Sequence, residues 1–359
     1  MSKHLITGFP GFIGRRLVAA LLERRPGDTV VALVEPRMEA AATQAAAEID
    51  AARIEILAGD IAERRLGLGD EDHDRLLAEI GVVHHLAAIY DLAVPEEIAQ
   101  KVNVEGTGNV LDFCRAADSL ERLNYVSTAY VAGDRTGVAY EHELNLGQGV
   151  KNHYESTKFQ AEVWVRELID RIPTTIYRPA IVVGDSRTGE TQKFDGPYYV
   201  LRFIAASRNR GMPIANIGRG ATPFNVVPVD FIVDSMVALG DAEEAIGETV
   251  HLCDPDPLSS AEMVRTLADL YAHRKPAYRI PPRGVTAALR FAPVREFYGG
   301  TPAESVRYLN HPVRYDTRRA TELLAASGLR CPRFPEYAPA MVEFFRRHED
   351  DPALAPAQR

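Results

Sequence analysis

The chain has 359 residues, of which 46% are hydrophobic and 25% charged, a composition typical of soluble globular proteins. Its 50 acidic residues outweigh 41 basic ones, and the net charge of −9 argues against a nucleic-acid-binding protein. The three cysteines lie too far apart in sequence for a disulfide framework or a paired-ligand zinc site, so we expect no metal and a reducing, cytoplasmic environment. No apolar run is long enough to span a membrane, and the N-terminus does not resemble a signal peptide.

Short apolar runs alternate with longer segments of helical periodicity in the first half of the chain. We predict strands at Lys3–Thr7, Thr29–Val34, Arg53–Leu57, Val82–Leu86, Arg122–Ser127 and Thr174–Tyr177. The segments between them, such as Gly11–Arg25 and Glu96–Ala117, are predicted to be helices. Apolar strands that alternate with helices form parallel sheets covered by helices on both faces. The sequence therefore predicts an α/β fold, a doubly wound parallel sheet that binds ligands beyond the carboxyl ends of its strands.

The pattern changes after Gly184, where glycine, proline and aromatic residues become frequent. We predict a dinucleotide-binding domain over residues 1–185, joined by later strands from 222–255, and a smaller, mostly helical substrate-binding region over 186–348. Predicted helices in this region are Ser259–Tyr271, Asp316–Ser327 and Tyr337–Arg347. The polar end of the chain, 349–359, is predicted to be a disordered tail.

A glycine-rich turn, TGFPGFIG at residues 7–14, joins the first predicted strand to the first predicted helix. Glycines permit a tight turn and a close approach of the backbone, while the helix N-terminus presents N–H groups and the positive end of its dipole. A plain turn is the alternative, but the position between strand and helix favours a cradle for a dinucleotide pyrophosphate. The residues assigned to this cradle are Gly8, Gly11, Phe12, Ile13 and Gly14.

The end of the second strand carries conflicting signals for the nucleotide ribose. Glu35 is typical of NAD binding, where an acid holds the ribose hydroxyls, whereas Arg37 is typical of the extra phosphate of NADP. Arg15, just after the glycine turn, would add positive charge near that phosphate. We favour NADP over NAD.

Two further strand ends fit a bound nucleotide. Asp60 and Ile61 follow the third strand, where the aspartate side chain reaches the adenine edge or, alternatively, only caps a helix. Ala87 and Ala88 follow the fourth strand, and their small side chains let the backbone lie against a cofactor.

The candidate chemical groups are Tyr154 and Lys158, which share one face of a predicted helix because they are four residues apart. A lysine ammonium beside a tyrosine hydroxyl favours phenolate, so we expect it to lower the pKa of Tyr154 and to make this residue a proton donor or acceptor. The same spacing recurs at Tyr271 and Lys275, which lead into a proline and follow no cofactor strand, and we interpret that pair as chance.

Two hydroxyls, Ser127 and Thr128, end the fifth predicted strand. Thr128 can donate to a substrate oxygen and form an oxyanion site with Tyr154. Ordinary hydrogen bonding at a strand end is the alternative. We also expect Phe194–Tyr199 to form one wall of the substrate site, with core packing as the alternative.

The order of motifs over the first 230 residues resembles the extended short-chain dehydrogenase/reductase family. The motifs are TGxxGxxG, GDI, HLAA, NVEGT, STAYV, YxxxK and YRPA. The phrases YVSTAYV, HYESTKFQAE and RPAIVVGDSRTG are similar to the fatty acyl-CoA reductase and thioester reductase branch. Glu35 departs from that branch, in which NADP enzymes often have a basic residue at this position.

This resemblance implies a Rossmann fold and hydride transfer from NADPH or NADH to a carbonyl, which is an acyl thioester, an aldehyde or a ketone. It implies Thr128, Tyr154 and Lys158 as the catalytic residues, with Lys158 also on the nicotinamide ribose and Arg178 near the nicotinamide. The substrate would be a small molecule, either free or bound to coenzyme A or a carrier. The full predicted cofactor set is Gly8, Gly11, Phe12, Ile13, Gly14, Arg15, Glu35, Arg37, Asp60, Ile61, Ala87, Ala88, Asn103, Ser127, Lys158, Arg178 and Pro179.

Other functions fit the same predicted fold. A nucleotide-sugar epimerase or dehydratase, or a sterol-type hydroxy dehydrogenase, would use the same cofactor. A non-catalytic NADP-sensing protein has no need of Tyr154 and Lys158, so their presence argues against it. A homodimer is compatible with the sequence, which does not fix the oligomeric state.

Overall fold

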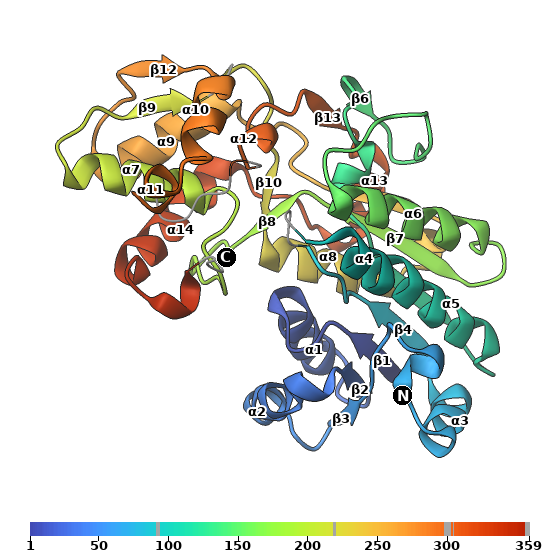
Figure 1. Ribbon diagram of the computed structural model, residues 1–359. Coiled ribbons are helices and arrows are strands. Elements are labelled where there is room, and N and C mark those ends of the chain that lie inside the picture. The colour runs from blue at the N-terminus through green and yellow to red at the C-terminus, as the bar shows by residue number, and fades with distance from the viewer. Residues whose placement is uncertain (91–93, 218–219, 298–302, 304, 356–359) are drawn as a thin grey trace.

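The computed structural model describes residues 1–90, 94–217, 220–297, 303 and 305–355 (Figure 1). Its central sheet has seven parallel strands in the order β11-β7-β5-β4-β1-β2-β3, and the direction of winding reverses between β1 and β4. This confirms the predicted doubly wound α/β fold. The strands are β1 (Lys3–Thr7), β2 (Thr29–Val34), β3 (Ile54–Ala58), β4 (Val82–His85), β5 (Arg122–Val126), β7 (Thr174–Pro179) and β11 (Thr249–Leu252).

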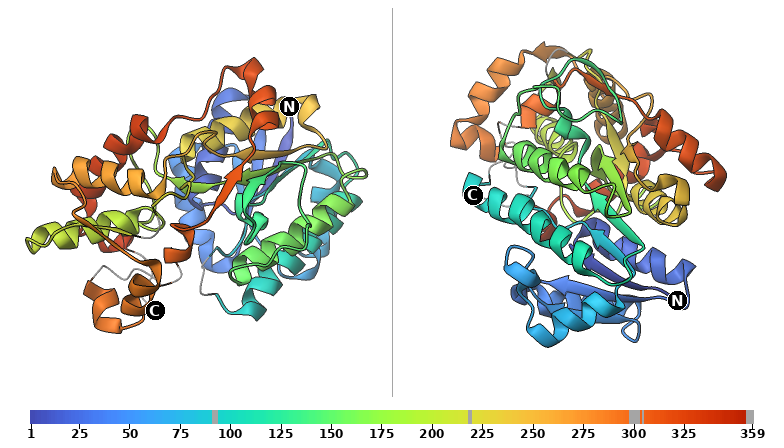
Figure 2. Two further views of the ribbon diagram at one scale, coloured as in Figure 1. Left: turned by 90° about the horizontal axis from the view of Figure 1, so that it is seen from above. Right: turned by 90° about the vertical axis from the view of Figure 1, so that its right-hand side faces the viewer.

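Helices cover both faces of this sheet (Figure 2). On one face α1 (Phe12–Arg24), α2 (Glu39–Ile49), α8 (Val229–Asp241) and α13 (Arg318–Leu324) share a hydrophobic core with the strands. On the other face α3 (Asp70–Glu79), α5 (Gly106–Ala116) and α6 (His153–Glu167) form a second core. Burial on both faces explains why the strand sequences are apolar throughout. The predicted helix Glu96–Ala117 consists of α4 (Glu96–Ala99), a π-helical turn at Gln100–Glu105, and α5.

A third core lies in the C-terminal region, where α7 (Tyr198–Asn209), α9 (Ser260–Ala272) and α14 (Phe334–His348) pack together. The shorter helices there are α10 (Pro282–Leu289), α11 (Ala292–Phe297) and α12 (Ser305–Tyr308). Three parallel strand pairs lie outside the main sheet: β8 (Ile181–Val183) with β10 (Val226–Pro228), β9 (Ala215–Ile217) with β12 (Tyr278–Ile280), and β6 (Gly137–Ala139) with β13 (Val313–Tyr315). Single 3-10 turns lie at Pro36–Met38, Arg64–Gly67, Ala129–Ala132, Glu243–Ala245, Ala325–Ser327 and Pro352–Leu354.

Strands within 222–255 were predicted to join the main sheet. Of the two described strands in this range, β11 joins it, whereas β10 pairs only with β8. The end of the chain also differs from the expected disordered tail. The carbonyl of Leu354 accepts a hydrogen bond from the backbone N–H of Phe194 (2.8 Å), and Leu354 packs against the third core. These two contacts of Leu354 hold the segment 349–355 against the third core. Residues 356–359 lie outside the described part of the chain. No helix in the described residues is both long and apolar enough to cross a membrane.

Candidate active site

The glycine turn forms a tight cradle at the N-terminus of α1. Gly8 has a φ of +92°, and a Cβ atom there would lie 2.9 Å from the backbone nitrogen of Ala87. A Cβ atom on Gly14 would lie 2.5 Å from the carbonyl oxygen of Gly8, and one on Gly11 would lie 2.8 Å from the same oxygen. The cap residue, Gly11, makes no side-chain bond to the first helical N–H groups. These positions need glycine, and the cradle they leave fits a pyrophosphate.

Both arginines assigned to the 2′-phosphate already have acidic partners. Arg37 forms a two-pronged ion pair with Glu35, with Nε 2.5 Å from Oε2 and Nη2 3.1 Å from Oε1. Arg15 pairs with Glu48 on α2. The Arg37 side chain is 75% exposed, and exposed pairs of this kind contribute only about 0–1 kcal/mol, so a phosphate can compete for it. Because both arginines have acidic partners, the preference for NADP over NAD stays a prediction.

The other predicted nucleotide contacts hold the loops after β3 and β4. Asp60 accepts a hydrogen bond from the backbone N–H of Ala62 (2.8 Å), which is a local turn and not the helix cap considered as the alternative, since Glu63 precedes the next helical turn. Thr7 Oγ1 accepts from the backbone N–H of Ala87 (3.2 Å), and Ala88 follows in the same loop. Ile61 is buried, with its side chain beside Gly106 at the start of α5.

Asn103 lies in the π-helical turn and ties the loop after β4 to α6. Its side-chain oxygen accepts from the backbone N–H of Ile89 (2.8 Å), and its amide nitrogen donates to the Ile89 carbonyl (3.1 Å) and to Thr157 Oγ1 (3.0 Å). Asn103 is therefore a structural link in this conformation.

Thr128 and Tyr154 lie near each other at the carboxyl end of β5, where the Thr128 side chain is close enough to influence the pKa of Tyr154. Tyr154 lies in the first turn of α6, which Asn152 caps by accepting from the backbone N–H of Glu155 (2.9 Å). Burial raises the pKa of Tyr154 to about 12, and the nearby Thr128 side chain opposes this rise. The expected lowering of this pKa is therefore wrong for the structure, and Tyr154 is a neutral phenol at physiological pH.

Lys158 lies one turn further along α6 and is buried. Its ammonium donates to the carbonyl of Val126 (2.8 Å) and lies 4.6 Å from the centroid of the Tyr125 ring. Burial lowers the pKa of Lys158 to about 8, and the negative charge of Glu162 limits this drop. The ammonium is thus anchored at the last residue of β5, directly beside the strand end that carries Thr128.

Glu162 binds the side chains of two further predicted cofactor residues, Ser127 and Arg178. Ser127 Oγ donates to Glu162 (2.6 Å), and the guanidinium of Arg178 binds the same carboxylate with its shortest contact at 2.6 Å. Burial alone would raise the pKa of Glu162, but Arg178, Arg166 and Ser127 lower it to about 2. The side chains of Ser127 and Arg178 are therefore engaged in a buried ion-pair network, and a cofactor contact from either stays a prediction, as does one from Pro179.

Sequence reasoning missed a second polar cluster behind Tyr154. The hydroxyl of Tyr308, from α12, donates to the buried carboxylate of Glu155 (2.9 Å) and accepts from the amide of Asn152 (2.7 Å). Lys151 donates to the carbonyl of Gly133 (2.6 Å) and pairs with Glu155. An asparagine just before a predicted helix is a cap signal, but no sequence signal links it to Tyr308.

Only part of the predicted substrate wall, Phe194–Tyr199, lies at the surface of the protein. Phe194 and Tyr198 are fully buried and pack against Phe345 with ring centroids 4.9 and 6.5 Å apart, so for these two the core-packing alternative holds. The ammonium of Lys193, just before this stretch, lies 5.5 Å from the ring centroid of Tyr90. Tyr90 in turn is close enough to Tyr154 to raise the pKa of Tyr154.

The second Tyr-x-x-x-Lys sequence has no comparable geometry. Helix α9 ends at Ala272, and His273 adopts a left-handed conformation, so Tyr271 and Lys275 do not share a helix face. Tyr271 instead donates to Glu349. The interpretation of this pair as chance agrees with its geometry.

A parallel doubly wound sheet with a glycine cradle at its first helix, and a Tyr-x-x-x-Lys helix beside the fifth strand, is the architecture of NAD(P)-dependent oxidoreductases of the extended short-chain dehydrogenase/reductase class. Comparison with protein families agrees: the model of the male sterility protein family, an NAD-binding domain, matches residues 6–236. The chain belongs to this family.

Relatives of the chain include large biosynthetic enzymes. It is 28% identical to a component of the linear gramicidin synthase of Brevibacillus parabrevis over 281 residues, which is 73% of this chain and 5% of that protein. It is 26% identical to a carboxylic acid reductase of Segniliparus rugosus over 274 residues, which is 66% of this chain and 23% of that protein. The chain thus spans a quarter or less of the length of these two relatives.

A solved structure shares the fold over nearly the whole chain. The terminal R domain from the myxalamid PKS-NRPS biosynthetic pathway superposes with a TM-score of 0.81 and 24% identity, covering 98% of this chain and 92% of that one. This likeness extends the shared fold through the C-terminal region, beyond the residues that the family model matches.

Proposed function

We propose that this chain is an NADPH-dependent reductase of acyl thioesters, in which Thr128, Tyr154 and Lys158 carry the chemistry. The observation that carries the proposal is the proximity of the Thr128 and Tyr154 side chains at the carboxyl end of β5, close enough for Thr128 to oppose the rise in the pKa of Tyr154. Two hydroxyls that meet at one point can both donate to a single carbonyl oxygen placed there. The names of the relatives, a carboxylic acid reductase and a gramicidin synthase, support a carboxyl-derived substrate.

The cofactor would lie along the carboxyl edge of the sheet. The cradle of Gly8, Gly11 and Gly14 would hold the pyrophosphate through backbone N–H groups and the dipole of α1. Arg37 would leave Glu35 for the 2′-phosphate. When bound, the reduced nicotinamide supplies a hydride.

Thr128 and Tyr154 polarise the carbonyl and stabilise the negative charge that develops on its oxygen. Tyr154 gives its proton to that oxygen, and the ammonium of Lys158 stabilises the resulting phenolate. With a thioester the first product is a hemithioacetal. When its hydroxyl loses a proton the C–S bond breaks, and a thiol and an aldehyde leave.

The substrate class is tested by mixing the purified protein with NADPH and an acyl-coenzyme A, a long-chain aldehyde or a ketone, while NADPH absorbance and free thiol are followed. We expect NADPH oxidation with acyl-coenzyme A, with thiol released as aldehyde forms. Oxidation with the aldehyde or ketone alone would restrict the activity to those carbonyls. No oxidation with any of the three would refute the reductase proposal.

A further inference from the structure

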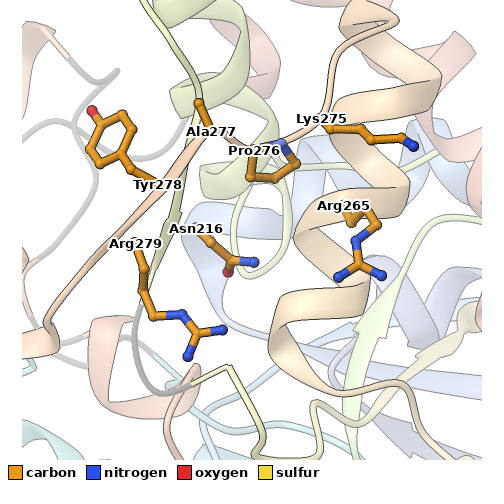
Figure 3. Close-up of a pocket in the computed structure, with 7 residues that line it drawn as sticks. All are labelled: Asn216, Arg265, Lys275, Pro276, Ala277, Tyr278 and Arg279. Atoms are coloured by element: carbon orange, nitrogen blue, oxygen red, sulfur yellow. The ribbon is translucent and has the colours of Figure 1, made fainter.

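A pocket opens between β9, β12 and α9, at the other end of the molecule from α6 (Figure 1). It shares no residue with the candidate active site. Among the described residues that line it, three are cationic and none is acidic. The lining residues are Asn216, Arg265, Lys275, Pro276, Ala277, Tyr278 and Arg279 (Figure 3).

Three polar side chains converge on this pocket because of strand register and helix packing. In the parallel pair of β9 and β12, Arg279 lies opposite Asn216, so their side chains project from the same face. Helix α9 packs on that face, where the Asn216 amide donates to the carbonyl of Ala261 (3.4 Å). Arg265 lies four residues after Ala261 and thus on the same side of the helix. Figure 3 shows the Asn216 amide between the two guanidinium groups.

The Arg279 guanidinium lies against the loop that contains Gly220. It packs over Gly220, where a Cβ atom would lie 2.8 Å from Arg279 Nη2. The carbonyl of Gly220 accepts from the backbone N–H of Ala261 (3.1 Å), which joins this loop to the first turn of α9. The acid near Arg265 in sequence, Glu262, has its carboxylate held by the backbone N–H (2.9 Å) and hydroxyl (2.6 Å) of Ser259.

Asn216 supplies a second and independent sign of a ligand. The residue is only 8% exposed, and within the described part of the chain its Oδ1 atom has no hydrogen-bond partner. A buried acceptor left without a donor destabilises the folded protein. A ligand with an O–H or N–H group would remove this cost.

We propose that the pocket binds a small phosphate monoester that also carries a hydroxyl or amino donor, which is the shared chemistry of sugar phosphates and nucleotides. The guanidinium groups of Arg265 and Arg279 match phosphate geometry, and the ammonium of Lys275 adds charge at the rim. Asn216 Oδ1 accepts from the donor on the ester group. This site is separate from the dinucleotide cradle and does not depend on the proposed reductase activity.

The test is calorimetric titration of the protein saturated with NAD⁺, which occupies the cradle but carries no phosphate monoester, with inorganic phosphate, ribose 5-phosphate or AMP. Ribose 5-phosphate binds more tightly than inorganic phosphate, and R265A and R279A each weaken its binding about tenfold or more. R274A removes an exposed arginine of the same loop that does not line the pocket, and it leaves binding unchanged. Tighter binding of AMP than of ribose 5-phosphate identifies a nucleotide site, and equal binding identifies a sugar phosphate site.

The N216A variant isolates the role of the buried acceptor. It loses the preference for ribose 5-phosphate over inorganic phosphate, while the affinity for inorganic phosphate stays the same. If N216A does not fold, N216D serves instead, because its carboxylate repels all three ligands. The proposal is overturned if none of the ligands binds at millimolar concentration, if R274A weakens binding as much as R279A does, or if N216A leaves the preference intact.

Discussion

The side chains of Thr128 and Tyr154 lie close enough for Thr128 to oppose the rise in the pKa of Tyr154, although Thr128 follows a strand and Tyr154 opens a helix. The contact depends on β5, which ends at Val126, and on α6, whose Lys158 donates to the Val126 carbonyl. The lysine thus anchors the helix to the strand end that carries the threonine. In the proposed function, a carbonyl oxygen is reduced where these two side chains come together.

The cradle predicts a severe loss of cofactor binding in G14A. The new Cβ atom would lie 2.5 Å from the Gly8 carbonyl oxygen, so the turn must open and the N–H groups of α1 move away from the pyrophosphate. We expect the Kd for NADPH to rise about 100-fold or more, a loss near 2.7 kcal/mol. G69A is the matched control, because a Cβ atom there has no neighbour within 4 Å. Equal affinities of G14A and G69A for NADPH would contradict the assignment.

The Glu35–Arg37 ion pair predicts opposite effects of two substitutions on cofactor choice. R37A removes a cation from the 2′-phosphate, and we expect about tenfold weaker NADPH binding with NADH binding unchanged. E35Q releases Arg37 from its partner and is expected to tighten NADPH binding. Fluorescence titration with both cofactors measures the four affinities. If R37A weakens the binding of both cofactors equally, Arg37 does not contact the 2′-phosphate.

The buried Glu162–Arg178 pair predicts a large loss of stability in E162Q. Both side chains are at most 2% exposed, and removal of one partner leaves a buried, uncompensated guanidinium, which costs about 3–5 kcal/mol. Urea unfolding followed by circular dichroism measures the change. E322Q, which breaks an exposed pair with Arg319, is expected to cost less than about 1 kcal/mol. Similar losses in the two variants would show that the buried network adds no special stability.

The lowered pKa of Lys158 predicts a pH limit on activity. Burial sets this pKa at about 8, so the ammonium that we propose to stabilise the Tyr154 phenolate is present below pH 8 and is lost as the pH rises through that value. We expect kcat/KM to fall about tenfold per pH unit above pH 8. Deprotonation of Lys158 does not lower this activity by unfolding the protein. Because the pKa of Lys158 in the folded protein lies below its ordinary value of 10.5, the contribution of this group to stability increases between pH 8 and 10.5.

A flat profile of kcat/KM up to pH 10 would show that the charge of Lys158 is not needed. K158R provides a check, because a guanidinium remains protonated across this range and the decline should move to higher pH. Thermal unfolding of K158R over the same pH range confirms that the comparison is made on folded protein.

The sheet was predictable from the sequence because both of its faces are buried. Continuous apolar runs placed β1 and β2 with their observed bounds, and the ends of β4 and β5 differ by one residue. The glycine turn was equally local, since its glycines act within eight residues of one another. These features depend on near neighbours in the chain, which is what periodicity and turn chemistry report.

The parts that sequence reasoning missed depend on contacts between distant segments. Tyr308 reaches Glu155 from a short helix, and Glu162 binds Ser127, which follows β5, and Arg178, which lies in β7. The pKa of Tyr154 was wrongly expected to fall, because spacing reveals a lysine on the same helix face but not the burial that dominates the shift.

The most direct test of the account is single-turnover NADPH oxidation by wild-type protein, Y154F and Y271F with acyl-coenzyme A. Tyr271 occupies the other Tyr-x-x-x-Lys sequence and is the matched control. We predict that Y154F loses about 10²–10⁴-fold in rate, the usual contribution of a general acid, while its NADPH affinity stays within about threefold of wild type and Y271F retains wild-type turnover. Undiminished turnover by Y154F would contradict the claim that the Thr128–Tyr154 pair is the site of carbonyl reduction.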